Sequence, residues 1–321
     1  MKERVLHILK SAQRISGEEI CRQLNISRTA VWKHIKTLKQ EGYQIDTQPR
    51  LGYQLLKTPD CLYPAEVKAG LETTFIGQKL FHFAQLSSTN DYAKELARDG
   101  GAEGAVVVTE AQVGGKGRLG RQWHSVAGED VALSVLLYPN ISPMETPKFS
   151  MLAAVAVAKG IEQTCGIKAA IKWPNDLLIN GKKVCGILVE MGAEMDRVKY
   201  VVLGIGINVN STPEMWSEDI KYKTTSVKEQ NGQPINRVKL VQNLLAQLEA
   251  LYLLCRERGF APILEEWCKW CVSLNCQAKV ETINGNFTGW VEGIDDSGSL
   301  LLRLKDGSVK TFTSGEVSLR L

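Results

Sequence analysis

Apolar residues recur at helical spacing in three segments at the start of the chain. The spacing predicts helices over residues 2–12, over a short segment after Ser16, and over residues 28–40. Ser16, followed by Glu19 three positions later, is a typical helix-start signal. The apolar positions expected to face inward are Val5, Leu6, Leu9, Ile20, Leu24, Val31, Ile35 and Leu38. The second and third segments, joined by a tight turn, form a helix-turn-helix pattern.

The third of these segments carries its polar residues on the face turned away from the apolar stripe. Two short strands follow, at 43–47 and 53–56, with a turn between them that places Arg50 at the tip of a hairpin wing. Base edges accept hydrogen bonds from such a helix, and flanking cations neutralise phosphates. The residues expected to contact DNA are Ser27, Arg28, Thr29, Trp32, Lys33, Lys36 and Arg50. Residues 57–60 have the composition of a linker.

Charge is distributed unevenly along the 321 residues. The net charge is +4, yet residues 1–60 contain eleven Lys or Arg against six Asp or Glu, which gives +5. The remaining residues contain 28 against 29, which gives −1. A local basic excess is the electrostatic signature of a small nucleic-acid-binding module. The alternative is a three-helix module that contacts protein, and the agreement of charge and helix pattern favours DNA.

The rest of the chain mixes helices and strands and then changes to strands alone. Helices are expected at 91–98, 149–165 and 237–257, and strands at 105–109, 131–138, 184–191 and 200–208. From residue 272 short alternating strands are separated by Asn284-Gly285, 296–298 and Asp306-Gly307, which are hairpin signals. We therefore predict an α+β protein with domains at 1–60, 61–271 and 272–321: a winged helix-turn-helix, a mixed α/β catalytic domain and a small β-barrel.

Composition excludes several other classes of protein. Apolar residues make up 44% and charged residues 23%, as in ordinary globular domains rather than disordered or fibrous chains. The longest apolar run, 151–158, is too short to span a bilayer, and the N-terminus lacks a signal-peptide core. Eight scattered cysteines fit a reduced, cytoplasmic protein with no membrane partner. Cys268 and Cys271 have a spacing seen in zinc sites, but such sites usually need four ligands, so incidental thiols are favoured.

Four glycines and three cations fall within residues 112–123. Glycine lets a backbone approach an anion, and Lys116, Arg118 and Arg121 add positive charge, so a phosphate or carboxylate ligand is expected. The spacing matches the dinucleotide fingerprint formally, but that motif needs a helix directly after its glycines, and here a loop is expected. A P-loop is excluded because Gly120 is not followed by Lys and Ser or Thr. A flexible surface loop is the alternative.

Two further segments carry candidate chemistry. In 171–176, Lys172 precedes an Asn175-Asp176 pair whose carboxylate is suited to hold Mg²⁺ or to orient a reacting group. Lys183 opens a predicted strand, so that its amine can project from a rigid edge. The segment 204–210 is a strand of small residues that is suited to lie under a flat ligand.

These segments together resemble the motif set of the biotin protein ligases. The motifs are Ser88-Thr-Asn90, Gly115-Lys-Gly-Arg-Leu-Gly-Arg-Gln-Trp123, Lys172-Trp-Pro-Asn-Asp176, Lys183-Val-Cys-Gly-Ile-Leu-Val-Glu190 and Gly204-Ile-Gly-Ile-Asn-Val-Asn210, in the family's order. The N-terminal module resembles that of the bifunctional type, which is both a biotin ligase and a repressor of the biotin operon. The likeness covers essentially the whole chain. Lys116 departs from the pattern, since many members have Arg there, and the bidentate fork of Arg is lost.

The resemblance implies a class II synthetase-like biotin ligase core, an SH3-like C-terminal barrel, and ATP, biotin and Mg²⁺ as ligands. Biotin and ATP would give biotinyl-5′-AMP, which a lysine of the biotin carrier then attacks. Catalytic roles would fall to Lys183, Arg118 and Asp176, with Asp176 the candidate Mg²⁺ ligand. Biotin contacts would come from Ser88, Thr89, Asn90, Gln112, Lys116, Gly117, Arg118, Lys183, Gly186 and Gly204. Nucleotide contacts would come from Arg121, Trp123, Lys172, Asn175 and Asn208.

The implied partners are the biotin carboxyl carrier protein of acetyl-CoA carboxylase, biotin operator DNA, and a second copy of the chain once the adenylate is bound. A dimer is expected because half-sites on DNA are read in pairs. Two alternatives stay open from the sequence: a repressor that only senses a small molecule, and a ligase for lipoate or a related acid. Pyrophosphate exchange separates the first from a ligase, and competition between biotin and lipoate separates the second.

Overall fold

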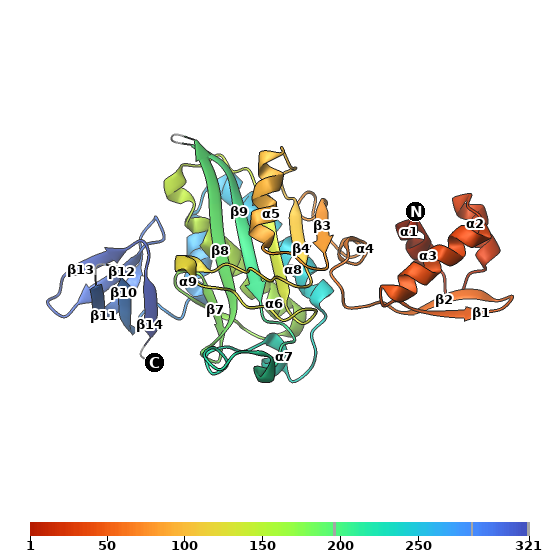
Figure 1. Cartoon of the computed structure of the whole chain (residues 1–321). Coiled ribbons are helices and arrows are strands. Elements are labelled where there is room, and N and C mark those ends of the chain that lie inside the picture. The colour runs from red at the N-terminus through yellow and green to blue at the C-terminus, as the bar shows by residue number, and fades with distance from the viewer. Residues whose placement is uncertain (195–196, 284, 320–321) are drawn as a thin grey trace. The chain divides into compact units, whose positions relative to one another are not determined.

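Three helices and a hairpin open the chain in the computed structural model, which describes residues 1–194, 197–283 and 285–319. The elements are α1 (Lys2–Ser11), α2 (Gly17–Leu24), α3 (Arg28–Gln40), β1 (Gln44–Gln48) and β2 (Gly52–Lys57). Ser16 and Ser27 accept hydrogen bonds from the backbone N–H groups of Glu19 and Ala30, so each caps its helix, as the sequence indicates for Ser16. The winged helix-turn-helix prediction is confirmed (Figure 1).

This first part of the chain, Met1–Cys61, forms a unit of its own, and Leu62–Leu321 forms the second. Its core contains most of the predicted apolar residues of the three helices, among them Val5, Ile20 and Val31, which are at most 1% exposed, whereas Leu24 is only half-buried. The hairpin docks on the turn before α2, where a Cβ on Gly52 would lie 2.1 Å from the Ile15 carbonyl oxygen. Only glycine permits this approach at its positive φ.

A seven-stranded sheet forms the centre of the second unit. Its order is β3-β4-β5-β9-β8-β7-β6, with only β3 and β4 parallel. The strands are β3 (Leu80–Phe83), β4 (Val106–Thr109), β5 (Val131–Leu137), β6 (Ala170–Lys172), β7 (Asp176–Ile179), β8 (Lys182–Glu194) and β9 (Arg197–Ile207). Strands β3, β6 and β7 were not predicted, because they are three or four residues long and too short for a distinct periodicity.

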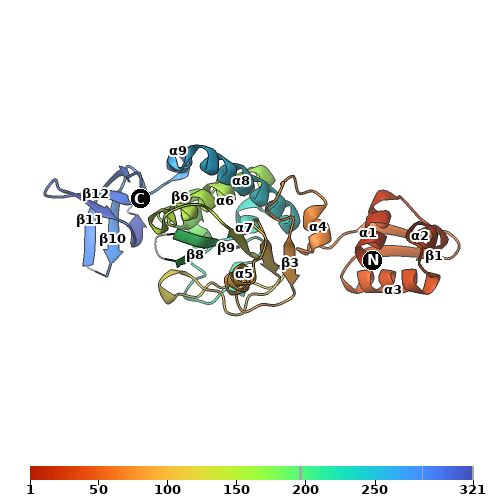
Figure 2. The same ribbon diagram turned by 90° about the horizontal axis from the view of Figure 1, so that it is seen from above.

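Helices cover both faces of this sheet. On one side lie α6 (Lys148–Cys165), α8 (Arg237–Arg258) and α9 (Ala261–Trp270), and on the other α5 (Thr89–Arg98) (Figure 2). The alternation of side chains along β4 serves the two layers: Val106 and Val108 belong to the core cluster on the α6 side, and Val107 to the cluster beneath α5. The remaining helices are α4 (Pro64–Lys68) and α7 (Val227–Asn231).

Within the part of the chain that the structure describes, α8 is the one helix long and apolar enough to cross a membrane. Two thirds of its apolar window (67%) is buried inside the protein, where it packs against α6 and α9. That burial is typical of the core helix of a globular domain.

The last part of the chain is a five-stranded antiparallel sheet with the order β13-β12-β11-β10-β14. Its strands are β10 (Gln277–Thr282), β11 (Gly285–Ile294), β12 (Leu300–Leu304), β13 (Val309–Phe312) and β14 (Glu316–Leu319). Val280, Val291 and Leu302 are fully buried and form its core. The predicted hairpins around 296–298 and 306–307 connect successive strands, whereas Asn284 of the first hairpin lies outside the described residues.

Candidate active site

A cavity that opens to solvent lies in the second unit, between the sheet, the start of α5 and the glycine-rich segment. Fifteen of the sequence-predicted residues line it. They are Ser88, Thr89, Asn90, Gln112, Lys116, Gly117, Arg118, Arg121, Trp123, Lys172, Asn175, Asp176, Lys183, Gly186 and Gly204. Gly315 and Val317 of the C-terminal sheet also contribute to the lining.

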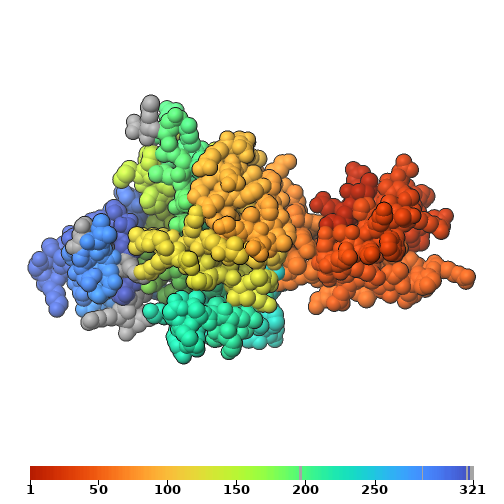
Figure 3. All heavy atoms as spheres, viewed as in Figure 1, coloured from red at the N-terminus to blue at the C-terminus, as the bar shows by residue number. Residues whose placement is uncertain are grey.

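The glycine-rich segment folds back on itself as a narrow loop. Gly114 N–H donates to the Ser87 carbonyl at its base, Trp123 N–H donates to Gly115, and Gly117 N–H donates to Arg121. A Cβ on Gly115 would lie 2.4 Å from the Trp123 carbonyl oxygen, which explains the glycine there. The tip is one 3₁₀ turn, Arg118–Gly120, and no α-helix lies between this turn and β5. The absence of that helix agrees with the exclusion of a dinucleotide fingerprint. This segment, yellow in Figure 3, is on the surface in front of the sheet.

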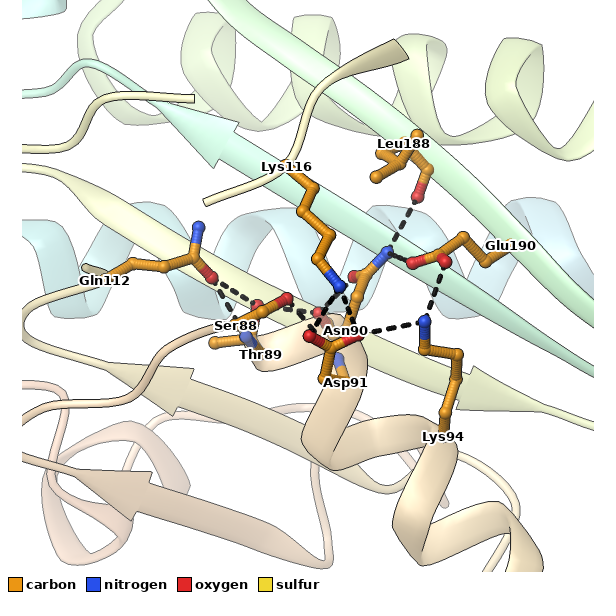
Figure 4. Close-up of polar contacts among 10 residues, drawn as sticks. Ser88, Thr89, Asn90, Asp91, Lys94, Gln112, Lys116, Leu188 and Glu190 are labelled. Atoms are coloured by element: carbon orange, nitrogen blue, oxygen red, sulfur yellow. Dashed lines mark hydrogen bonds and ion pairs between the residues drawn. The ribbon is translucent and has the colours of Figure 1, made fainter. Parts of the chain in front are cut away.

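Polar side chains from the start of α5 form one wall of the cavity. Ser88 caps the helix by accepting from Asp91 N–H, while Thr89 donates from both its N–H and its hydroxyl to the Gln112 Oε1, at 2.9 and 3.1 Å (Figure 4). Ser134 on β5 lies within hydrogen-bond distance of Thr89 Oγ1 and donates to Asn90 Oδ1. These buried donors and acceptors suit a small polar ring that carries both N–H and C=O groups.

Lys183 and Asp176 form an ion pair at the cavity, with 2.6 Å between Nζ and Oδ1. Asp176 begins β7 and Lys183 is the second residue of β8, its antiparallel neighbour. Behind them Cys185 is fully buried, and burial raises the pKa of its thiol far above the usual range. A thiol held neutral is a poor nucleophile, so Cys185 is not suited to covalent catalysis.

Arg118 connects the tip of the glycine loop to the segment before β7. Its Nη1 donates to Asn175 Oδ1 at 3.0 Å, and Asn175 in turn donates to the Ile187 carbonyl on β8. The guanidinium therefore reaches across the cavity from a loop to the sheet.

Trp123 lies flat against two glycines. A Cβ on Gly206 would stand 2.3 Å from Trp123 Cε2, and one on Gly186 would stand 3.0 Å from Cζ3. Lys183 Nζ is 5.7 Å from the indole centroid. The indole Nε1 is buried without a hydrogen-bond partner in the protein. A buried donor without a partner beside a cavity is a group that an acceptor on a ligand would satisfy.

One predicted nucleotide contact lies elsewhere. Asn208 is 2% exposed, donates to the Thr225 carbonyl at 3.1 Å, and is not among the residues lining the cavity. Other lining residues were not predicted as site residues, among them Trp173, Ile187 and Gly206. The two-residue spacing of Gly204 and Gly206 on one strand is a signal that would have identified Gly206.

Asp176 is the one carboxylate among the described residues that line the cavity. Among the described residues, no group of three His, Cys, Asp or Glu side chains is placed to hold an ion. Mg²⁺ usually takes one or two carboxylates and completes its shell with phosphate oxygens and water, so Asp176 fits a metal that arrives with a nucleotide. At the other candidate, burial raises the pKa of the Cys271 thiol to about 12, which disfavours the thiolate that zinc requires.

The predicted DNA contacts all lie on the surface of the first unit. Trp32 is 54% exposed on α3, with Lys36 Nζ 5.3 Å from its ring centroid. Arg28 pairs with Glu18, and Arg50 occupies the β1–β2 turn with a positive φ of 67°. Ser27, Thr29 and Lys33 are exposed as well. An exposed indole and cations on one helix form a surface that nucleic acid can accept.

Three families match successive parts of the chain. Residues 2–54 match an HTH domain, residues 82–208 the Biotin/lipoate A/B protein ligase family, and residues 277–320 the Biotin protein ligase C terminal domain. These matches follow the order of the winged unit, the sheet that holds the cavity, and the C-terminal strands.

Relatives align along nearly the whole chain. The bifunctional ligase/repressor BirA of Bacillus subtilis is 44% identical over 95% of this chain and 94% of its own length. That of Escherichia coli is 30% identical over 99% and 96%. Among solved structures, the biotin protein ligase of Aquifex aeolicus in complex with biotin and ATP has a TM-score of 0.64 and 28% identity, covering 76% of this chain and 99% of its own. The chain belongs to the BirA family of bifunctional biotin ligases and repressors.

Proposed function

We propose that the cavity binds biotin and ATP side by side and joins them as biotinyl-5′-AMP. A carboxylate oxygen of biotin attacks the α-phosphorus of ATP, and the bond to the bridging oxygen breaks to release pyrophosphate. A lysine amine of a carrier protein then attacks the acyl carbon, and AMP leaves with the electron pair. The observation that carries this proposal is the convergence of Lys183, Arg118 and the glycine loop around one cavity.

The central difficulty of the first step is the approach of two anions. We assign Lys183 to the biotin carboxylate and to the acyl phosphate that follows, and Arg118 and Lys172 to the phosphates. Cations fixed in a partly buried site offset the repulsion, and they need no reorganisation as charge develops in the transition state. Bound Mg²⁺ would supply further neutralisation of the phosphates, with Asp176 as its protein ligand.

The polar wall and the indole are assigned to the two halves of the adenylate. Ser88, Thr89, Asn90 and Gln112 supply donors and acceptors for the biotin ring system, together with the backbone of Lys116 and Gly117. Gly186 and Gly204 leave room for it. The nucleotide side falls to Trp123, Arg121, Lys172 and Asn175. Because Asn208 bonds to Thr225, we assign it to hold the segment after β9 rather than to touch nucleotide.

A second cavity adjoins the first and offers a place for the carrier protein to approach it. It shares Arg118 and Asn175 with the first cavity and continues over Pro143, Met144 and Met191. Met144 is 80% exposed and Met191 41% exposed, so this cavity presents apolar side chains to solvent. We infer that the carrier protein docks here and brings its lysine to the shared wall.

The winged unit supplies the second activity. We propose that it binds the operator of the biotin genes, with biotinyl-5′-AMP as corepressor and with two copies of the chain on paired half-sites. A cytoplasmic location follows from both activities, since ATP, the carrier and the operator are found there.

The decisive experiment is exchange of labelled pyrophosphate into ATP. Biotin-dependent exchange is expected from the wild-type chain and absent from Lys183→Ala. Exchange without biotin, or none with it, would contradict adenylation and favour a protein that only senses its ligand. Competition between biotin and lipoate in the same assay tests the substrate, because the matching family includes ligases for both acids.

A further inference from the structure

The ammonium of Lys116 forms its ion pair with a residue of α5 rather than with a group inside the cavity. Its Nζ lies 2.8 and 2.7 Å from the two carboxylate oxygens of Asp91, so one cation bridges both (Figure 4). Lys116 belongs to the glycine loop, and Asp91 belongs to the first turn of α5, directly after Ser88, Thr89 and Asn90. The pair therefore joins the loop to the wall that we assign to biotin.

Asp91 is itself fixed by a chain of polar contacts. Lys94, one turn along α5, lies 2.9 Å from Asp91 and 2.7 Å from Glu190 on β8. Glu190 also accepts from Asn90 Nδ2 at 2.7 Å. Lys116, Asp91, Lys94, Glu190 and Asn90 thus form one network that ends at a residue lining the cavity (Figure 4).

Ionisation of Asp91 is maintained within this network. Partial burial opposes the charge, but the hydrogen bonds from Lys116 and Lys94 outweigh it, so the pKa of Asp91 lies below its usual value. Asp91 also stands in the first turn of α5, where a negative charge interacts favourably with the helix dipole. The carboxylate is therefore charged whenever the enzyme works near neutral pH.

We propose that the Asp91–Lys116 ion pair is a latch that holds the glycine loop against α5 and so sets how long biotinyl-5′-AMP stays bound. Both residues act as positioning residues for the loop, and the proposal rests on the proposed adenylate function. The ion pair is weak because solvent reaches both partners: the side chain of Lys116 is 51% exposed and that of Asp91 is 35% exposed. Exposed ion pairs contribute little and are screened by salt, so this one can open when the carrier must reach the acyl group.

The test measures release of biotinyl-5′-AMP that has been synthesised chemically and loaded onto the full chain. Asp91→Asn and Lys116→Met are each expected to speed release about two- to fivefold, as for loss of an exposed pair. The double variant is expected to be no faster than either single variant, because both remove the same contact. Lys116→Arg, which keeps a cation, restores slow release. Raising the salt concentration speeds release from wild type and has little effect on the two single variants.

Glu95→Gln is the matched control, since Glu95 is an exposed acid on the same helix. It removes the same charge and is expected to release at the wild-type rate. Release unchanged in both single variants, additive effects in the double variant, or an equal effect of Glu95→Gln would overturn the latch. Loading with synthetic adenylate keeps this result separate from the proposed function, which fails instead if wild type makes no adenylate from biotin and ATP.

Discussion

The Lys183 ammonium lies 2.6 Å from the Asp176 carboxylate, and both side chains line the cavity. They are 35% and 24% exposed, so the pair is accessible to ligands. In the proposed reaction the two charges separate to different partners: the amine to the biotin carboxylate, and the Asp176 carboxylate to the Mg²⁺ that would accompany the nucleotide. The ion pair holds both side chains in place before the substrates arrive.

Lys183→Ala is expected to lower adenylate formation at least about 100-fold, because it removes the cation placed where charge develops. The measurement is biotin-dependent pyrophosphate release under saturating ATP. Lys79→Ala, an exposed lysine before β3, serves as the matched control for loss of one positive charge. A wild-type rate from the Lys183 variant would refute its assignment.

Arg118→Gly is expected to speed adenylate release by about tenfold, the effect of losing a hydrogen bond from a charged donor. The reason is that Arg118 bridges the loop tip to Asn175. Arg118→Gln distinguishes the lost guanidinium from added backbone freedom, and we expect fast release from both variants. Slow release from either would show that the guanidinium does not retain the adenylate.

Gly206→Ala is expected to raise the KM for ATP more than about tenfold. A Cβ at this position would stand 2.3 Å from Trp123 Cε2, so the indole must move. Gly293→Ala is the control, since a Cβ there has no neighbour within 4 Å. Steady-state kinetics with ATP varied at saturating biotin give the answer; an unchanged KM would mean that the indole position is not used by the nucleotide.

Glu110 makes the stability of the second unit depend on pH. Burial opposes its ionisation, but the hydrogen bond with His82, the charge of Arg237 at 2.9 Å and the N–H of Leu62 together lower the pKa of Glu110 to about 2. Because the pKa of Glu110 is lower in the folded than in the unfolded protein, its carboxylate stabilises the fold at pH values above the unfolded-state pKa. This stability is lost as the pH falls through the folded-state pKa. We therefore expect about 3 kcal/mol to disappear between about pH 5 and pH 2.

Glu110→Gln tests this relation by urea denaturation across that pH range. The variant is expected to lose about 3 kcal/mol or more at pH 7, because Arg237, only 1% exposed, would be left without its carboxylate. Its stability is expected to vary less with pH than that of wild type. Glu72→Gln, at an exposed acid, is expected to leave the curve unchanged. Parallel curves for wild type and Glu110→Gln would contradict the assignment.

On α3, Lys33→Ala is expected to weaken binding to the biotin operator and to other DNA sequences equally. The slope of log affinity against log salt concentration is expected to fall by about the contribution of one phosphate contact. Trp32→Ala is expected to weaken operator binding without changing that slope, since the indole carries no charge. Titrations at several salt concentrations separate the two effects. A Trp32 variant that binds like wild type would remove the indole from the interface.

Much of the fold was accessible from the sequence because long elements have a clear period. The helices at 28–40 and 149–165 and the strand at 131–138 were predicted nearly to the residue. The site's glycine and cation segments were recognisable because the chemistry fixes their residue types. The Asp91–Lys116 pair was not predictable, since its partners are 25 positions apart and meet only when the loop folds onto α5. Asn208 shows the converse: its segment was informative, yet its side chain bonds to Thr225.

Transfer of biotin to a carrier protein is the sharpest test of adenylation in this cavity. The full chain is mixed with biotin, ATP, Mg²⁺ and the isolated carrier domain, and the carrier's intact mass and modified residue are followed by mass spectrometry. We expect one biotin on one carrier lysine with wild type, and unmodified carrier with Lys183→Ala or without ATP. Biotinylation that persists in the Lys183→Ala variant, or a carrier left unmodified by wild type, would contradict it.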